Sequence, residues 1–326
     1  MSIQKAPPPQ KPADCSEDLY AQIAAFQQAI LSWYHDNRRS FPWRETTDPY
    51  KILVSEIMLQ QTQTERVVPK YTEFLEAFPT AHALAEAPLA DVLEHWNGLG
   101  YNRRARYLQQ ACQTVVRDMG GVFPETPAGL QKLPGVGPYT SRAIACFAFG
   151  DRNPASVEPF IETNIRSVFI FFFFNDKQEI EQDVELQKRT LNDVPSSDSI
   201  ISISKGESVS DAQILRLVAD SMPSADVMSA REWFYALMDY GSMLKKKTVN
   251  PNRRSSSYTK QSRFEGSVRQ ARGVILRQLV KNKETSLSLS QIQKIEYIDI
   301  ERLEKAAELL CAESLIIRDG DLYRIV

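Results

Sequence analysis

Apolar residues recur every three or four positions along most of the chain, which is the spacing of one face of an α-helix. Between residues 16 and 37 they fall at Leu19, Ile23, Phe26, Ile30 and Trp33. The same period marks the ranges 50–60, 66–78, 88–95, 105–119, 127–132, 140–149, 211–221 and 229–244. Short stretches with Gly or Pro separate these ranges. The pattern predicts an all-α protein, a bundle of helices joined by short loops.

The pattern changes near the C-terminal end. The ranges 269–281, 290–295 and 299–314 are typical of helices, and 315–325 predicts two strands joined at Asp319 and Gly320. Three helices followed by such a hairpin resemble a small winged-helix domain. It could contact DNA or another protein, and none of its helices is basic enough to mark a recognition helix. The apolar run 168–174 is too short to span a bilayer, so we expect a buried helix there.

Composition adds limits to the kind of protein this can be. The 326 residues are 43% hydrophobic and 25% charged, with a net charge of −2, so a surface for nucleic acid must be a local patch. The four cysteines, Cys15, Cys112, Cys146 and Cys311, are scattered. That spacing argues against a disulfide framework or a clustered metal site and favours a reducing compartment. The Pro-rich residues 1–16 predict a flexible tail without a signal peptide, and the Ser-rich stretch 195–210 predicts an insertion.

One stretch combines glycines with a helix start. Residues 133–140 read LPGVGPYT, so that Gly135 and Gly137 immediately precede a helical pattern. The N–H groups at a helix N-terminus lack intrahelical partners and suit an anion such as a phosphate. The alternative is an ordinary corner between two helices, in which the glycines serve only to adopt positive φ.

Further motifs carry a resemblance to a known family. In chain order they are FPWR (41–44), VSEIMLQQTQ (54–63), GLGYNRRAR (98–106), LPGVGPYT (133–140) and ALMDYG (236–241). Their order is similar to that in the helix-hairpin-helix DNA glycosylases, and the chain resembles the A/G-specific adenine DNA glycosylases over roughly residues 20–245. The resemblance implies a two-lobed fold. We expect one lobe from residues 17–45 and 155–244, a helical barrel lobe from 46–154, a basic linker at 245–268 and the winged-helix-like domain at 269–326.

Two carboxylates are the candidates for chemistry. Glu56 lies among apolar neighbours, which should raise its pKa and suit it to act as a general acid. The resemblance implies that Glu56 protonates the leaving base. Where the family has Asp two residues before Asn, this chain has Glu162 and Asn164, and a carboxylate there would stabilise the cationic sugar. Glu158 is a rival for that role.

The resemblance also implies residues for the base and for the DNA. The base pocket would be framed by Arg39, Trp43, Arg44 and Tyr235, although the family usually has Gln or Glu at the position of Tyr235. A base-flipping enzyme fills the gap that it leaves, and Leu99 or Tyr101 could do so. The other expected DNA contacts are Gln61, Thr62, Arg103, Arg104, Gly135, Val136, Gly137, Tyr139, Thr140, Lys245, Lys246, Arg253 and Arg254.

The chain departs from the family in two further respects. At Tyr139 the bifunctional branch has a lysine that forms a Schiff base, so we expect a monofunctional enzyme. The family's iron–sulfur loop would follow residue 244, but residues 245–272 contain no cysteine and hold nine Lys or Arg against one acid, Glu265. We therefore expect no iron–sulfur cluster and no other cofactor, and a basic wrap that binds phosphates in its place.

The expected function is excision of a mispaired base from double-stranded DNA, most simply adenine opposite guanine or 8-oxoguanine. One alternative is removal of a deaminated base, uracil or hypoxanthine, and another is a DNA-binding protein without catalysis. We expect a monomer that acts in the cytoplasm on a bacterial nucleoid and does not contact a membrane.

Overall fold

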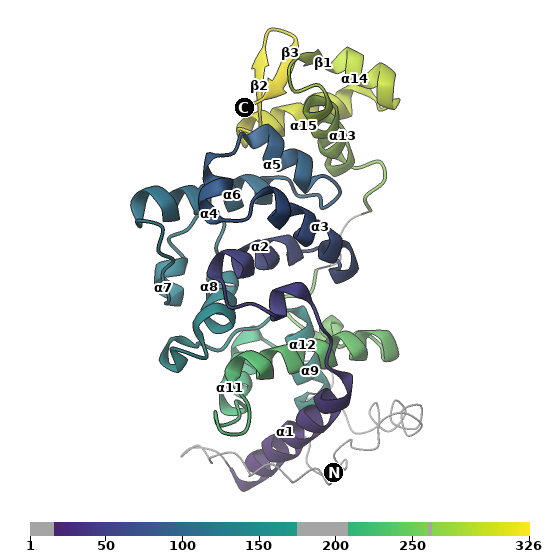
Figure 1. Ribbon diagram of the computed structural model, residues 1–326. Coiled ribbons are helices and arrows are strands. Elements are labelled where there is room, and N and C mark those ends of the chain that lie inside the picture. The colour runs from purple at the N-terminus through teal and green to yellow at the C-terminus, as the bar shows by residue number, and fades with distance from the viewer. Residues whose placement is uncertain (1–15, 175–207, 260–262) are drawn as a thin grey trace. The chain divides into compact units, whose positions relative to one another are not determined.

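The computed structural model describes residues 16–174, 208–259 and 263–326 (Figure 1). The chain forms two compact units, each built from two separate stretches. The first unit is Met1–Ser40 with Ala145–Lys260, and the second is Phe41–Ile144 with Gln261–Val326. The predicted lobe borders at residues 45 and 154 therefore fall 5 to 10 residues later than these unit borders. The Ser-rich stretch 195–210 lies almost wholly outside the described residues.

The first unit is helical. Its elements are α1 (Glu17–Asn37), the π-helix η2 (Ala145–Phe149), the short η3 (Pro154–Ser156), α9 (Thr163–Phe173), α11 (Asp211–Asp220), α12 (Ala230–Lys247) and η5 (Pro251–Arg254). Phe26 of α1 lies at the centre, with ring centroids 5.1 Å from Phe169 and 5.9 Å from Trp233. The apolar run 168–174 is the buried second half of α9 and its C-cap, as predicted. No described helix is long and apolar enough to cross a membrane.

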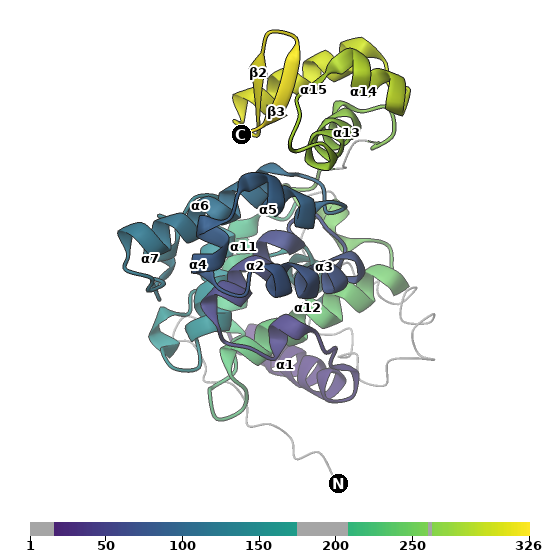
Figure 2. The same ribbon diagram turned by 45° about the horizontal axis from the view of Figure 1, so that its top comes forward.

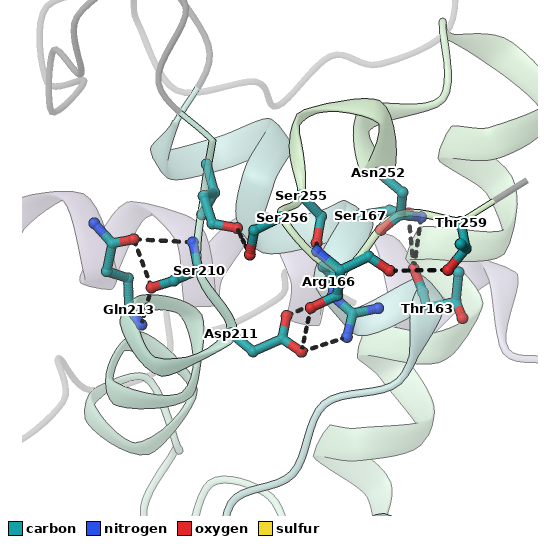
Figure 3. A network of polar contacts seen from close by, with 12 residues as sticks. Thr163, Arg166, Ser167, Ser210, Asp211, Gln213, Asn252, Ser255, Ser256 and Thr259 are labelled. Atoms are coloured by element: carbon teal, nitrogen blue, oxygen red, sulfur yellow. Dashed lines mark hydrogen bonds and ion pairs between the residues drawn. The ribbon is translucent and has the colours of Figure 1, made fainter.

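The residues that follow α12 fold back onto the start of α9 and α11 (Figure 3). Asn252 Nδ2 donates to Ser167 Oγ at 2.6 Å, and Arg166 binds the Asp211 carboxylate through two hydrogen bonds of 2.8 and 2.9 Å. Ser255 forms an isolated parallel bridge with residue 209. The start of the predicted basic linker is thus fixed by polar contacts within the first unit.

The second unit contains two groups of helices. The first group is η1 (Pro42–Arg44), α2 (Pro49–Leu59), α3 (Thr64–Ala77), α4 (Ala81–Glu86), α5 (Leu89–Trp96), α6 (Arg103–Asp118), α7 (Pro127–Leu130) and α8 (Pro138–Ile144). Helix α2 is its core, because every residue from Ile52 to Met58 is buried. Helix α4 had no counterpart among the predicted elements.

The second group is the C-terminal module, which Figure 2 shows with its hairpin. It comprises α13 (Val268–Lys281), β1 (Leu287–Ser288), α14 (Leu289–Glu296), α15 (Ile300–Ala312), β2 (Ile316–Asp319) and β3 (Leu322–Ile325). The predicted helices and hairpin are present, and β1 adds a third strand in the antiparallel order β1-β3-β2. The comparison with a winged helix stays a prediction. The module belongs to the same compact unit as residues 41–144.

Candidate functional site

Glu56 is a buried acid on the central helix of the second unit. Helix α2 begins where the Asp48 side chain accepts a hydrogen bond from the Tyr50 N–H and Pro49 occupies the first turn, a favoured arrangement. The residues around Glu56 are apolar and almost fully buried, and Glu56 itself is only 6% exposed. Tyr139 Oη donates to Glu56 Oε2 at 3.1 Å. The acid therefore contacts a half-buried phenol on the first turn of α8.

The glycine turn before α8 has the geometry of a tight corner. Gly135 adopts φ +74°, and a Cβ atom there would lie 2.6 Å from Tyr107 Cβ, so glycine is required both for conformation and for space. Gly137 does not have a positive φ, which contradicts the idea that both glycines serve that purpose. The first intrahelical bond runs from Ser141 N to Gly137 O, and the backbone at Gly135 and Gly137 is exposed.

Two of the predicted contacts at this corner are buried. Val136 is in the core, and Thr140 is buried with its hydroxyl accepting from Gln60 Nε2 at 3.3 Å. The glycine turn therefore presents backbone rather than these side chains. The hydrogen bond to Gln60 connects the corner to the end of α2, about one helical turn after Glu56.

Two neighbouring turns hold residues in a conformation that is uncommon for side chains other than glycine. Gln61 has φ +56° and Tyr101 has φ +49°, both in the left-handed region. Gln61 is exposed and Tyr101 is half-buried. Both are among the residues that the sequence analysis assigned to contact with DNA.

Arg104 connects these two turns. Its Nη1 donates to the carbonyls of residues 57, 58 and 60 at 2.8, 2.9 and 2.5 Å. Its Nη2 donates to Thr62 Oγ1 at 3.1 Å and to the carbonyls of residues 99 and 100 at 3.2 and 3.1 Å. The guanidinium is 8% exposed, and burial lowers the pKa of Arg104 to about 10. Arg104 therefore holds the turns and is not available to a phosphate, contrary to the prediction.

Leu99 is also unavailable. It is 3% exposed and packs inside the second unit, so of the two expected wedge residues only Tyr101 reaches the surface. Arg103, the neighbour of Arg104, has a side chain that is 56% exposed, and its contact with a phosphate stays a prediction. Its guanidinium lies 5.5 Å above the Tyr107 ring.

In the first unit, Glu162 caps a helix. Its Oε1 accepts from the N–H groups of Asn164 and Ile165 at 2.6 and 2.9 Å, and Oε2 accepts from Asn164 Nδ2 at 3.2 Å. Desolvation raises the pKa of Glu162, although these hydrogen bonds and the charge of Lys245 oppose the shift. Its rival Glu158 is exposed. Asn164 thus orients the carboxylate that the family resemblance singled out.

Lys245 lies within electrostatic range of that carboxylate. Burial lowers the pKa of Lys245, and the charge of Glu162 partly restores it. Lys245 therefore acts within the first unit, whereas Lys246 and Arg253 are exposed and Arg254 is half-buried. Of the predicted basic contacts in this segment, Lys246 and Arg253 are the best placed to meet a phosphate.

The expected base-pocket residues have packing partners. Arg39 Nε donates to Asp239 Oδ1 at 2.7 Å, and the carboxylate of Asp239 is fully buried. The ring of Tyr235 lies flat on Phe147, with 4.5 Å between centroids. Both residues therefore stabilise the first unit around α12. Asp239, inside the ALMDYG motif, could not be paired with Arg39 from the sequence, because the two residues are 200 positions apart.

Trp43 and Arg44 are buried in the second unit. Trp43 stacks on Phe41 with 5.1 Å between centroids, and the Arg44 guanidinium lies 5.0 Å from the centroid of the same ring. Trp43 also meets Tyr71 edge-on. These contacts anchor the loop at residues 41–44 within the second unit, and a role for Trp43 and Arg44 at a base stays a prediction.

The residues after α12 do not fit a four-thiolate cluster, because residues 245–272 contain no cysteine. Cys112 and Cys146 are buried within helices, and Cys311 is half-buried in α15. Within the described ranges, no group of three or more His, Cys, Asp or Glu side chains is placed to hold a metal ion.

Comparison with known proteins agrees with this arrangement. Residues 54–193 match the family described as HhH-GPD superfamily base excision DNA repair protein. The chain is 44% identical over 140 residues to adenine DNA glycosylase of Mycobacterium tuberculosis H37Rv, which covers 43% of this chain and 44% of that protein. It is 44% identical over 139 residues to the human adenine DNA glycosylase, covering 40% of this chain and 26% of that protein. The match thus spans less than half the length of these relatives.

The fold has a counterpart among solved structures. A thermostable thymine-DNA glycosylase superposes with a TM-score of 0.51 and 23% identity, over 68% of this chain and 87% of that one. This likeness concerns the fold alone. The sequence match contains Glu56, the glycine corner, Tyr139 and Glu162. The sequence of residues 54–193 is therefore similar to that of the HhH-GPD superfamily of base excision DNA repair proteins.

Proposed function

We propose that the protein is a monofunctional DNA glycosylase that hydrolyses the N-glycosidic bond of adenine mispaired with guanine or 8-oxoguanine. The observation that carries this proposal is the contact between Glu56 and Tyr139. A binding protein has no need for a carboxylate buried on an apolar helix, because burial of an acid is costly. The relatives that share this segment are adenine DNA glycosylases.

Glu56 would supply the proton for the departing base. A carboxyl group placed beside the base can act as a general acid and deliver a proton as the glycosidic bond breaks. Tyr139 would orient the carboxyl group through its 3.1 Å hydrogen bond. Once the base has left, the sugar carries positive charge that a carboxylate can stabilise. We assign that role to Glu162, which Asn164 holds through Nδ2.

Double-stranded DNA would be bound mainly by N–H groups of the protein backbone. The exposed glycine corner at residues 135–137 offers N–H groups to a phosphate. Gln61 and Tyr101 would enter the base stack beside the everted nucleotide. Arg103, Lys246 and Arg253 would neutralise phosphates along the backbone. We propose that the protein does this as a monomer, and the nucleoid location stays a prediction.

No step requires a cofactor in this proposal. The family's cluster loop has its counterpart here in the segment that Asn252 ties to α9 at Ser167. That segment is fixed by hydrogen bonds between side chains, which is a different solution to the same problem of anchoring the chain after α12. We therefore propose that the enzyme works without an iron–sulfur cluster.

The test is a screen of duplexes that carry adenine, uracil, hypoxanthine or thymine in each mispair, followed by alkali to cleave abasic sites. Release of adenine is expected, and it should be strongly slowed in Glu56→Gln. Release of uracil or hypoxanthine with adenine untouched would replace the substrate by a deaminated base. Tight binding without release of any base would show a DNA-binding protein instead.

The single-function assignment has its own test. Tyr139 has no amine, so no Schiff base can form there. Borohydride added during turnover is expected to trap no adduct between enzyme and DNA. A trapped adduct, located by peptide mapping to any lysine of the chain, would contradict the monofunctional assignment.

A further inference from the structure

The C-terminal module reaches the expected wedge residue. Arg269, on the first turn of α13, donates from Nη1 to Tyr101 Oη at 2.7 Å. Its guanidinium also lies 5.5 Å from the centroid of the Tyr101 ring and 5.3 Å from that of Phe264. Nothing in the sequence pattern signalled this contact, because the two residues are 168 positions apart.

The module is held against α5 and α6 by charge at other points. Lys283, just after α13, binds Asp91 at 2.7 Å and Glu94 at 3.4 Å, both on α5. At the end of α15, the carbonyl of Glu313 accepts from Arg106 Nη1 at 3.1 Å. The loop that carries Tyr101 connects α5 to α6. Arg269 is therefore not a loose surface side chain, because contacts to both helices fix the helix that carries it.

Tyr101 needs such support. Its φ of +49° is unfavourable for a residue with a Cβ atom, so the neighbouring contacts must hold it. Arg104 lies 5.5 Å from the centroid of the ring and binds the carbonyl of the preceding residue. Arg269 fixes the opposite part of the side chain, the phenol oxygen. Together the two arginines determine both the backbone and the far end of Tyr101.

We propose that Arg269 is a positioning residue, by which the C-terminal module sets the orientation of Tyr101 for entry into the base stack of DNA. This inference rests on the proposed function, in which Tyr101 acts as the wedge. The module then contributes to recognition of a mispair without reading any base. The module does so by holding the half-buried ring of Tyr101 in the orientation in which the ring would enter the DNA double helix.

The test compares three variants of the full chain. Tyr101→Phe keeps the ring and removes the oxygen that Arg269 binds, and Arg269→Gln removes the guanidinium. Arg277→Gln is the matched control, because Arg277 lies on the same helix and pairs with Glu296 of α14 at 2.9 Å, inside the module. Thermal unfolding curves verify that each variant is folded.

The measured quantity is the preference for a duplex with one adenine mispair over the matched duplex. A 2-aminopurine next to the mispair reports stacking by its fluorescence. We expect Arg269→Gln and Tyr101→Phe each to reduce the preference by about tenfold, as loss of one hydrogen bond to a charged donor implies. The double variant should be no weaker than either single one, and Arg277→Gln should equal the unchanged protein.

Three outcomes would overturn the inference: a preference unaffected by Arg269→Gln, a preference increased by it, or effects that add in the double variant. An increase would mean that Arg269 covers Tyr101 and does not position it. Tyr101→Ala separates this inference from the proposed function. If that variant keeps the full preference, the wedge role of Tyr101 is wrong. If it loses the preference while Arg269→Gln does not, only the role of Arg269 is wrong.

Discussion

Replacement of Arg104 by lysine is the sharpest test of how the two turns are held. The change keeps a positive charge and a long side chain, but it replaces five N–H donors in a planar group by three on one nitrogen. Arg104 donates to six oxygens spread over residues 57–62 and 99–100. A lysine nitrogen can reach at most three of them.

The size of the effect follows from that count. Three lost hydrogen bonds at about 1 to 1.5 kcal/mol each cost about 4 kcal/mol. Gln61 and Tyr101 are then free to leave the left-handed region, which returns about 1 kcal/mol for each residue. The expected net loss in the free energy of unfolding is about 2 kcal/mol, the difference between these two amounts.

Two assays measure the consequences. Urea unfolding gives the loss of stability, and a duplex-binding assay gives the preference for a mispair, which should fall because Gln61 and Tyr101 are both released. The control is Arg103→Lys, since Arg103 is 56% exposed and its ion pair with Glu313 is long, at 3.9 Å. That variant should lose less than about 0.5 kcal/mol. If Arg104→Lys is equally mild, the assignment of Arg104 as the residue that holds both turns is refuted.

Three further predictions concern the acids and the glycine corner. Glu56→Gln should slow base release by about 10²- to 10⁴-fold in single turnover without changing duplex affinity. The control Glu65→Gln, at an exposed position, should change neither the rate of base release nor the affinity. Because burial raises the pKa of Glu162 in the folded protein, its ionisation opposes folding, so stability is lost as pH rises from its unfolded to its folded pKa. Urea melts at pH 4 and pH 8 give the free energy of unfolding of Glu162→Gln minus that of the unchanged protein. This difference should be more favourable to the variant at pH 8 than at pH 4, and an equal difference at both pH values would contradict the reasoning. Gly135→Ala should lose about 2 to 4 kcal/mol in the same melts, since its Cβ would meet Tyr107 at 2.6 Å and φ is +74°, and a loss below 1 kcal/mol would show that the corner is not fixed.

The helices were largely predictable from the sequence, because the burial of one helix face is written into residue spacing. Helix α2 and the buried half of α9 are clear cases. Helix α4 has six residues and β1 has two, so neither is long enough to show a period. The expected lobe borders differ from the borders of the compact units by 5 to 10 residues. The unit borders depend on which distant segments pack together, and spacing along the chain does not report that.

In the candidate site, too, features that depend on residues adjacent in sequence could be predicted, and features that depend on distant residues could not. The burial of Glu56 could be predicted, because its apolar neighbours are adjacent in sequence and lie on the same helix. The roles of the arginines could not. Arg39 binds an aspartate 200 residues away, and Arg104 binds carbonyls 44 to 47 residues before it. A motif that is rich in arginine can therefore indicate where a nucleic-acid surface lies, but it does not show which of its arginines contact the nucleic acid.

That distinction has a physical basis. Arginine offers five donors in a rigid plane, so one buried guanidinium can satisfy the carbonyls of two turns that no helix or sheet would satisfy. Such turns are what an enzyme needs to hold Gln61 and Tyr101 in a left-handed backbone conformation at its surface. The strain at those two residues and the buried charge of Arg104 are parts of one arrangement. The arginine is costly to bury without acceptors, and the turns are costly to form without the arginine, so each accounts for the presence of the other.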